Sequence, residues 1–219
     1  MTFKVVMIDS IDLINKIPSL NTNYTSVESK QKTVVILGSS VSSELIEKYL
    51  KASSDITRHF IENGFNVVHG CGSHGIMGKV YNAAKEASIK DAKGKPLQNL
   101  AIVVEPLWGD ENLHDCIPIG KANSEAERIV KFTKVADNFV IFPGSVTTLQ
   151  EASTLIQNNR YPKLGEVKKV VLFGADFWKG LVLQYKKIFE MNLLKENPIG
   201  KLFHIANSKE EVLRIILRK

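Results

Sequence analysis

The stretch "NFVIFPGSVTTLQE", residues 138–151, decides the fold. It starts as an apolar strand from Phe139 to Phe142, is interrupted by Pro143-Gly144, and continues with helical spacing. Proteins with alternating strands and helices hold phosphate at such strand–turn–helix units, because the first backbone N–H groups of a helix have no partner within it. Phosphate turns of this kind usually contain several glycines. Here a serine, a valine and two threonines follow the single glycine.

The same alternation extends from this stretch in both directions along the chain. Short apolar runs recur between segments of helical spacing, and turn residues separate them. Residues 107–123, "LWGDENLHDCIPIGKAN", fit neither pattern and predict a long, irregular connection. Beside the opening unit, we expect strands over 33–38, 65–70, 100–106, 168–174 and 202–206, and helices over 44–63, 79–87, 124–136, 177–194 and 208–219.

Continuously apolar strands that alternate with helices predict an α/β fold, with a doubly wound parallel sheet and helices on both faces. We expect it to form a single domain over residues 32–219. Residues 20–32, "LNTNYTSVESKQK", are polar and rich in Asn, Ser, Thr and Lys. Residues 1–31 are therefore interpreted as an N-terminal extension and a linker.

The composition is that of an ordinary soluble protein, with 44% apolar and 24% charged residues. The 29 Lys and Arg exceed the 23 Asp and Glu and give a net charge of +6, which suits an anionic ligand. The lysines are scattered, as on a solvated surface, so nucleic acid is not an expected partner. No apolar run is long enough to cross a membrane, and acidic residues interrupt the apolar N-terminus. We expect a cytoplasmic protein with no membrane partner.

The two cysteines, Cys71 and Cys116, have neither the spacing of a zinc site nor that of a disulfide framework. Both are therefore expected to be reduced. Cys71 lies in a glycine-rich turn, where it could be reactive, but a small space-filling role is favoured.

Three of the expected strands end in turns of small residues: 38–40, 70–73 and 143–145. The carboxyl ends of parallel strands meet at one edge of the sheet, and ligands of such sheets bind there. Three turns of this kind at one edge favour a binding crevice, although glycines also serve ordinary turns.

These residues resemble the LOG ("lonely guy") family, many of whose members carry the label "possible lysine decarboxylase". The resemblance covers about residues 33–219 and rests on the turn after the first strand, on "GCGSHGIMG", on Glu127-Arg128 and on "PGSVTTLQE", in this order. It implies a Rossmann-like fold, a homodimer, and hydrolysis of a cytokinin riboside 5′-monophosphate, or an AMP-like nucleotide, to the free base and ribose 5-phosphate. We expect no cofactor and no metal.

The main motif of the family, PGGxGTxxE, is divergent in this chain. Pro143, Gly144, Thr148 and Glu151 match it, whereas a serine and a threonine replace its second and third glycines. The other motif, GGGxxGLMG, has Cys71 in place of one glycine. The arginine and glutamate to which the family assigns catalysis are both present.

The resemblance assigns roles to ten residues. A carboxylate near the anomeric carbon can stabilise the positive charge that builds on ribose and can orient the attacking water, which is the role expected of Glu151. Arg128 would hold the phosphate or assist the departing base. The residues expected to bind the substrate and its phosphate are Gly38, Ser39, Gly72, Gly75, Gly144, Ser145, Thr147 and Thr148.

Each of these residues also has a purely structural interpretation. Thr148-x-x-Glu151 is itself a capping-box pattern, and Arg128 could lie on the surface along an apolar helix face. Glu127 is better explained as a helix cap together with Ser124 than as a catalytic group. His74 could contact base or ribose, but a solvated loop histidine is favoured.

The replaced glycines leave the function open between two classes. If position 145 or 147 requires a positive φ, a residue with a side chain costs about 1–2 kcal/mol there. The hydroxyls can instead compensate with donors of their own. The first hypothesis is a phosphoribohydrolase, and the alternative is a non-catalytic protein that binds a nucleotide or a cofactor phosphate. A dinucleotide-dependent redox enzyme is disfavoured because the first turn lacks GxGxxG, and a lysine decarboxylase because no signature places a Schiff-base lysine.

Overall fold

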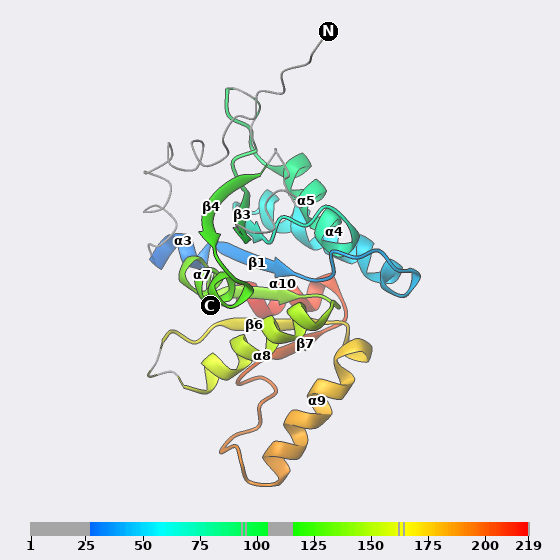
Figure 1. Cartoon of the computed structure of the whole chain (residues 1–219), viewed down its shortest axis with the longest axis vertical. Helices are drawn as coiled ribbons and strands as arrows, with labels where there is room; N and C mark the ends of the chain where they lie inside the picture. The colour runs from blue at the N-terminus through cyan, green and yellow to red at the C-terminus, as the bar shows by residue number, and fades with distance from the viewer. Residues whose placement is uncertain are drawn as a thin grey trace.

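The computed structural model describes residues 27–218, except 93, 95, 105–115, 162 and 164. Within these residues the chain forms a seven-stranded sheet in which every neighbouring pair is parallel (Figure 1). The order across the sheet is β4-β3-β2-β1-β5-β6-β7. The expected doubly wound α/β fold is confirmed. The strands are β1 (Thr33–Leu37), β2 (Asn66–His69), β3 (Asn99–Val104), β4 (Ile117–Ala122), β5 (Asn138–Ile141), β6 (Lys169–Phe173) and β7 (His204–Ala206).

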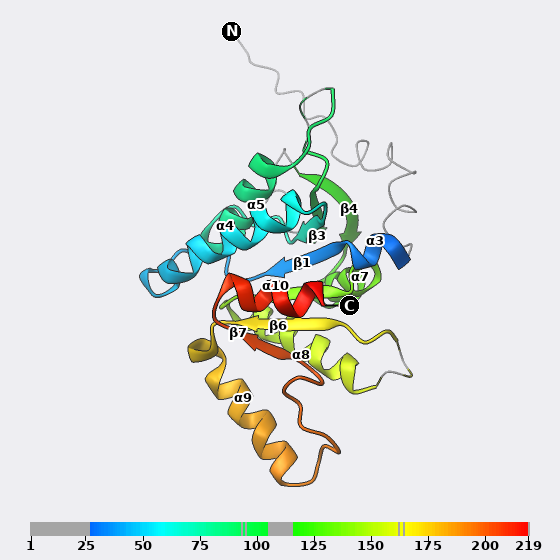
Figure 2. The same ribbon diagram turned by 180° about the vertical axis from the view of Figure 1, so that it is seen from behind.

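Helices cover both faces of the sheet, as Figures 1 and 2 show from opposite sides. One face packs against α4 (Glu47–Glu62), α5 (Gly75–Ala87) and α10 (Lys209–Leu217). The other packs against α7 (Glu125–Val135), α8 (Val146–Arg160) and the part of α9 (Ala175–Glu190) that reaches from Trp178 to Tyr185. The C-terminal end of α9 extends away from the sheet (Figure 2). None of the helices described is both long and apolar enough to cross a membrane.

The two helix layers enclose two separate apolar cores. In β1, Val35 and Leu37 belong to the core under α7 and α8, whereas Val34 and Ile36 belong to the core under α4, α5 and α10. All five residues of β1 are buried. Burial of both strand faces explains why this strand is continuously apolar rather than alternating.

The prediction of an irregular connection over residues 107–123 is wrong in its second half. Residues 117–122 form β4, which pairs with β3, with a register irregularity between Ala101 and Ile102. Pro118 and Gly120 obscure this strand in the sequence, since proline and glycine are rare inside strands. Because β4 is the edge strand of the described sheet, proline is tolerated there. Residues 107–115 lie outside the described residues.

The last part of the expected linker is helical. Residues Val27–Gln31 form α3, which lies against β1, and Thr33 Oγ1 donates a hydrogen bond of 2.6 Å to the carbonyl of Ser29. Lys30 forms an ion pair of 3.3 Å with Glu166. Residues 1–26, the rest of the expected extension and linker, lie outside the described residues.

The strand order places a switch point between β1 and β5. From β1 the chain builds outward through β2, β3 and β4, then returns to place β5 on the other side of β1. The loops that follow β1 and β5 therefore leave in opposite directions, which opens a crevice at the carboxyl ends of these strands. Two backbone hydrogen bonds join the two turns: Phe142 N–H to the carbonyl of Leu37 at 2.8 Å, and Ser39 N–H to that of Pro143 at 3.0 Å.

Candidate functional site

A cavity of about 210 Å³ lies at this switch point. Seven of the ten predicted site residues line it; of the other three, Ser39 and Gly144 lie in the turns beside it and Gly75 is the first residue of α5. The cavity therefore unites segments that are more than one hundred residues apart in the chain. The lining residues are Leu37, Gly38, Ser40, Gly70, Gly72, Met77, Glu125, Arg128, Ser145, Thr147, Thr148 and Glu151.

One wall of the cavity is the start of α8. Its N-cap residue, Ser145, makes no capping hydrogen bond with its side chain. By contrast, the N-cap residues Ser124 of α7 and Ser208 of α10 each accept a hydrogen bond from a backbone N–H in the first turn. The first turn of α8 therefore keeps its backbone donors for a ligand, together with the hydroxyls of Thr147 and Thr148. Such a helix start favours an anion.

The replaced glycines of this turn carry no backbone strain. Ser145 has φ −83° and ψ −168°, which is extended backbone, and Thr147 lies inside α8. Among the described non-glycine residues, those with positive φ are Cys71 and Asn192. The expected cost at position 145 or 147 is therefore not incurred. Gly144, which matches the family motif, does require its hydrogen, because an added Cβ would lie 2.6 Å from the Cβ of Thr148 and would overlap its hydroxyl.

The strain lies instead in the second glycine-rich turn, at Cys71. This residue stands where the family motif has a glycine, and its φ of 68° is left-handed, which costs a side-chain-bearing residue about 1–2 kcal/mol. Its backbone N–H donates a hydrogen bond of 3.0 Å to Nδ1 of His69, and His69 Nε2 lies 2.7 Å from Oδ1 of Asn99. Burial lowers the pKa of His69 to about 4, so the imidazole is neutral and Nδ1 stays an acceptor.

Three charged side chains meet at the back of the cavity. Arg128 Nη2 lies 2.5 Å from Oε2 of Glu125 and 3.8 Å from Oε1 of Glu151. Arg128 Nη1 donates a hydrogen bond of 3.4 Å to the carbonyl of Gly70, and the guanidinium carbon lies 5.9 Å from the ring centre of Phe132. Arg128 is 8% exposed and Glu151 3% exposed. The interpretation of Arg128 as a surface residue is therefore wrong.

Glu151 is a buried acid whose charge state changes near neutral pH. Burial raises the pKa of its carboxyl to about 7; Arg128 lowers this pKa, and Glu125 raises it. The capping-box interpretation of Glu151 is wrong, because α8 begins at Val146 and places Thr148 inside the helix. A carboxyl with a pKa near 7 beside a permanent cation can accept and return a proton at physiological pH.

Local contacts explain Glu127 and His74, as expected. The N–H of Glu127 donates to Ser124 Oγ at 3.2 Å, and the Glu127 carboxylate accepts from the N–H of Asn123 at 2.8 Å. The predicted cap is confirmed, with the carboxylate reaching one residue further back than in a standard capping box. His74 is exposed, precedes α5, and contacts Ser73 Oγ at 2.7 Å through Nδ1, outside the cavity lining.

Glu125 is the charged side chain of the cavity that sequence reasoning missed. It lies three residues before Arg128 on α7, and residues at this spacing share a helix face. That spacing was the available signal, although alone it indicates only a surface ion pair. The described residues contain no group of three or more His, Cys, Asp or Glu side chains that could hold a metal ion.

Comparison with known proteins gives a family for this arrangement. Over residues 57–216 the chain matches the model of a protein family described as "possible lysine decarboxylase". The chain belongs to this family. It is the family of the LOG proteins, so the resemblance inferred from the glycine-rich motifs is confirmed. No curated protein sequence is a significant match to the chain.

Solved structures of similar fold support the architecture. The X-ray structure of TM1055 has a TM-score of 0.56 and 14% identity, over 84% of this chain and 98% of that one. The molybdenum cofactor carrier protein from Chlamydomonas reinhardtii has a TM-score of 0.55 and 16% identity, over 85% of this chain and 98% of that one. At 14% and 16% identity, these two comparisons show that the chain shares its fold with both proteins.

Proposed function

We propose that the chain is a phosphoribohydrolase that cleaves the N-glycosidic bond of a nucleoside 5′-monophosphate, such as a cytokinin riboside monophosphate or AMP. The observation that carries this proposal is the pairing of Glu151 with Arg128 beside the uncapped start of α8, within one cavity at the switch point of the sheet. Water enters the reaction, and the products are the free base and ribose 5-phosphate.

The 5′-phosphate would bind at the first turn of α8. The backbone N–H groups there and the hydroxyls of Ser145, Thr147 and Thr148 supply donors, and the helix dipole favours a negative charge. Arg128 is less suited to this task than the family resemblance implies, because Glu125 lies 2.5 Å from its guanidinium and balances its charge. Ser145 and Thr147 thus take the place of the missing glycines with donors of their own.

Glu151 would act on the ribose. As the base departs, positive charge builds at the anomeric carbon, and an ionised carboxylate next to that carbon stabilises it. The same carboxylate can accept a proton from the attacking water. With a pKa of about 7, Glu151 is ionised in about half of the molecules at neutral pH. The positive charge of Arg128 stabilises the ionised form of Glu151. The buried Nε–H of Arg128 has no hydrogen-bond partner among the described residues and could donate to the departing base.

The size of the cavity fits part of such a substrate. Its volume of about 210 Å³ is below the roughly 300–1,000 Å³ of pockets that enclose whole drug-sized ligands. The phosphate and ribose would occupy the cavity, and the base would extend towards its mouth.

A product assay over a panel of nucleoside monophosphates tests the proposal. The parent chain should release free base and ribose 5-phosphate from at least one of them, and Glu151→Gln should reduce turnover by about 10²-fold or more, as expected for loss of a general base. The matched control is Glu62→Gln, an exposed carboxylate at the end of α4. The hydrolase proposal fails if the folded parent chain releases no base from any nucleotide, or if Glu151→Gln retains full turnover.

The second candidate is a non-catalytic protein that binds a nucleotide or a cofactor phosphate. It is favoured by the ion pair with Glu125, which occupies Arg128, and by the shared fold with a molybdenum cofactor carrier protein. This candidate would be selected if a nucleotide stabilises the chain against heat, if this stabilisation survives Glu151→Ala, and if the parent chain shows no turnover.

We also propose a homodimer, as the family resemblance implies, and a cytoplasmic location, as the two cysteines without a disulfide framework indicate. Trp178 is the buried residue of α9, whereas Phe177, Leu183 and Phe189 on the same helix are 47%, 53% and 36% exposed. An apolar helix of this kind suits a contact with a second copy. Light scattering of the purified chain should give twice its monomer mass, and Leu183→Asp should reduce that mass. A monomeric parent chain would contradict the proposal.

A further inference from the structure

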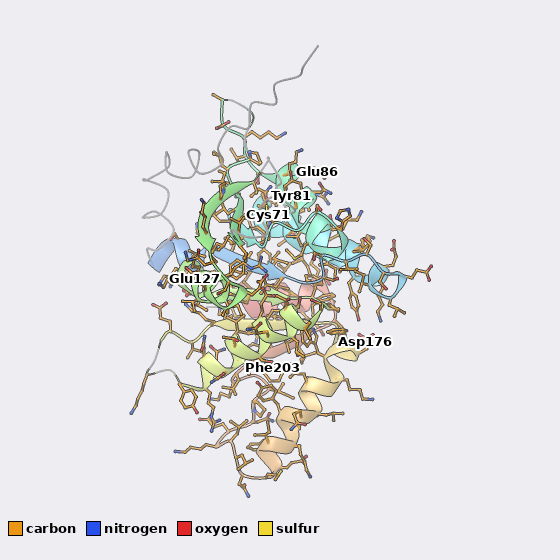
Figure 3. The ribbon with its side chains drawn as sticks, in the orientation of Figure 1. Cys71, Tyr81, Glu86, Glu127, Asp176 and Phe203 are labelled. Atoms are coloured by element: carbon orange, nitrogen blue, oxygen red, sulfur yellow. The ribbon has the colours of Figure 1, made fainter. Side chains whose placement is uncertain are left out.

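The two cysteines of the sequence, 45 residues apart, meet in the folded chain. Cys71 lies in the turn after β2 and Cys116 directly precedes β4. Their sulfur atoms are 3.1 Å apart, and the two residues are 0% and 3% exposed. In Figure 3, Cys71 is labelled beside Tyr81, in the part of the molecule formed by α5, β3 and β4. Tyr81, Ala101 and Val103 complete the apolar cluster around the two sulfurs.

The surroundings hold Cys71 in this position. Its left-handed φ of 68° is maintained by the hydrogen bond from its N–H to the neutral ring of His69. The sulfur of Cys71 therefore faces Cys116 without a change in the backbone of the turn. A disulfide bond is about 2.05 Å long, so the sulfurs need to approach each other by only about 1 Å.

We propose that Cys71 and Cys116 are a redox-active pair that forms a reversible disulfide. With a peroxide as oxidant, the two thiols lose two electrons and two protons, one S–S bond forms, and hydrogen peroxide becomes two molecules of water. With a low-molecular-weight disulfide as oxidant, one thiolate attacks a sulfur of the reagent and releases one thiol. The second cysteine then displaces the other half of the reagent as a second thiol. A dithiol reductant reverses the reaction.

The bond would join the candidate site to the edge of the sheet. Gly70 and Gly72 flank Cys71 in the chain and line the cavity, and the carbonyl of Gly70 accepts the hydrogen bond from Arg128. Oxidation would therefore link the turn of Gly70 and Gly72, which forms part of the cavity wall, covalently to the start of β4. The disulfide itself does not depend on the function proposed for the cavity.

Equilibrium with glutathione tests the pair directly, because the sequence contains no cysteine besides these two. The full chain is equilibrated with mixtures of reduced and oxidised glutathione, both folded and unfolded in urea. Thiols are then trapped with an alkylating reagent and intact masses are measured. We expect the folded chain to lose the mass of two hydrogen atoms, and a peptide that links Cys71 to Cys116 to appear after digestion without reductant. The glutathione ratio that half-oxidises the folded pair should be at least tenfold more reducing than the ratio for the unfolded chain.

The single variants Cys71→Ser and Cys116→Ser supply the matched controls. Each keeps one buried thiol, so neither folded variant can form the intramolecular bond or lose the mass of two hydrogen atoms. The proposal is overturned if the folded chain keeps both thiols or binds glutathione at both sulfurs. The proposal is also overturned if the same glutathione ratio half-oxidises the folded and the unfolded chain, since the fold would then contribute nothing to the pairing. Circular dichroism confirms that the chain remains folded in each mixture.

Discussion

Replacing Glu151 by glutamine is expected to stabilise the folded chain at neutral and alkaline pH. Glu151 is 3% exposed, and burial is the largest cause that raises the pKa of its carboxyl, from 4.5 to about 7. Between these values the folded chain holds a proton that the unfolded chain releases. The contribution of this carboxyl to stability is therefore fully present below pH 4.5 and is lost as the pH rises towards 7.

The size of the effect follows from the difference between the two pKa values. A difference of about 2.5 units corresponds to about 3 kcal/mol of unfolding free energy, at about 1.4 kcal/mol per unit. This cost is almost complete at pH 7 and is about 1 kcal/mol at pH 5. Glutamine has nearly the same shape and carries no charge, so the variant avoids the cost. Arg128 keeps its partner Glu125 in the variant.

Urea unfolding of the parent chain and of Glu151→Gln at several pH values from 5 to 8 measures this difference. The variant should be more stable by about 3 kcal/mol at pH 8, and the advantage should shrink to about 1 kcal/mol at pH 5. Comparing the two chains at each pH removes the contribution of His69, which both contain. Glu62→Gln, on the exposed end of α4, should change neither value. An advantage that is absent at pH 8, or that does not depend on pH, would refute the reasoning.

Three other residues lead to further predictions. Burial lowers the pKa of His69 to about 4, so His69 should cost the parent chain roughly 3 kcal/mol of stability as the pH falls from 6.5 to 4, against the opposite change from Glu151; in urea unfolding, the stability of the parent chain relative to His69→Gln should therefore fall by this amount. Gly144→Ala should lower stability by about 1–3 kcal/mol, because its Cβ would overlap the first turn of α8, whereas Gly165→Ala meets nothing within 4 Å and should leave the melting temperature unchanged. Glu125→Gln removes a charge that raises the pKa of Glu151, so the pH for half-maximal hydrolysis should fall; an unchanged pH profile would contradict this.

Most of the sheet could be predicted from the sequence because its central strands are buried on both faces. In β1 and β6 this burial demands an unbroken apolar run, which is easily recognised. β4 could not be recognised in this way. It lies at the edge of the described sheet, where pairing on one side tolerates Pro118 and Gly120, and these residues are typical of loops.

The candidate site was predicted only in part, because the sequence shows residue types but not backbone angles or neighbours. Resemblance to the LOG family indicated Arg128 and Glu151, and both residues line one cavity in the structure. It did not indicate Glu125, whose importance comes from its distance to the guanidinium. Nor could it show that the backbone is left-handed at Cys71 and extended at Ser145, since φ depends on how each turn packs.

The position of the cavity also bears on how the chain unfolds. Its walls come from both halves of the sheet, β4-β3-β2-β1 and β5-β6-β7, which join through the pairing of β1 with β5. A ligand in the cavity contacts both halves of the sheet and stabilises their association. At a hundred times its Kd, a ligand that binds only the folded chain adds about 2.7 kcal/mol to the free energy of unfolding. Amide hydrogens in β2 and in β6, on opposite sides of that junction, should then exchange more slowly together, although neither strand lines the cavity.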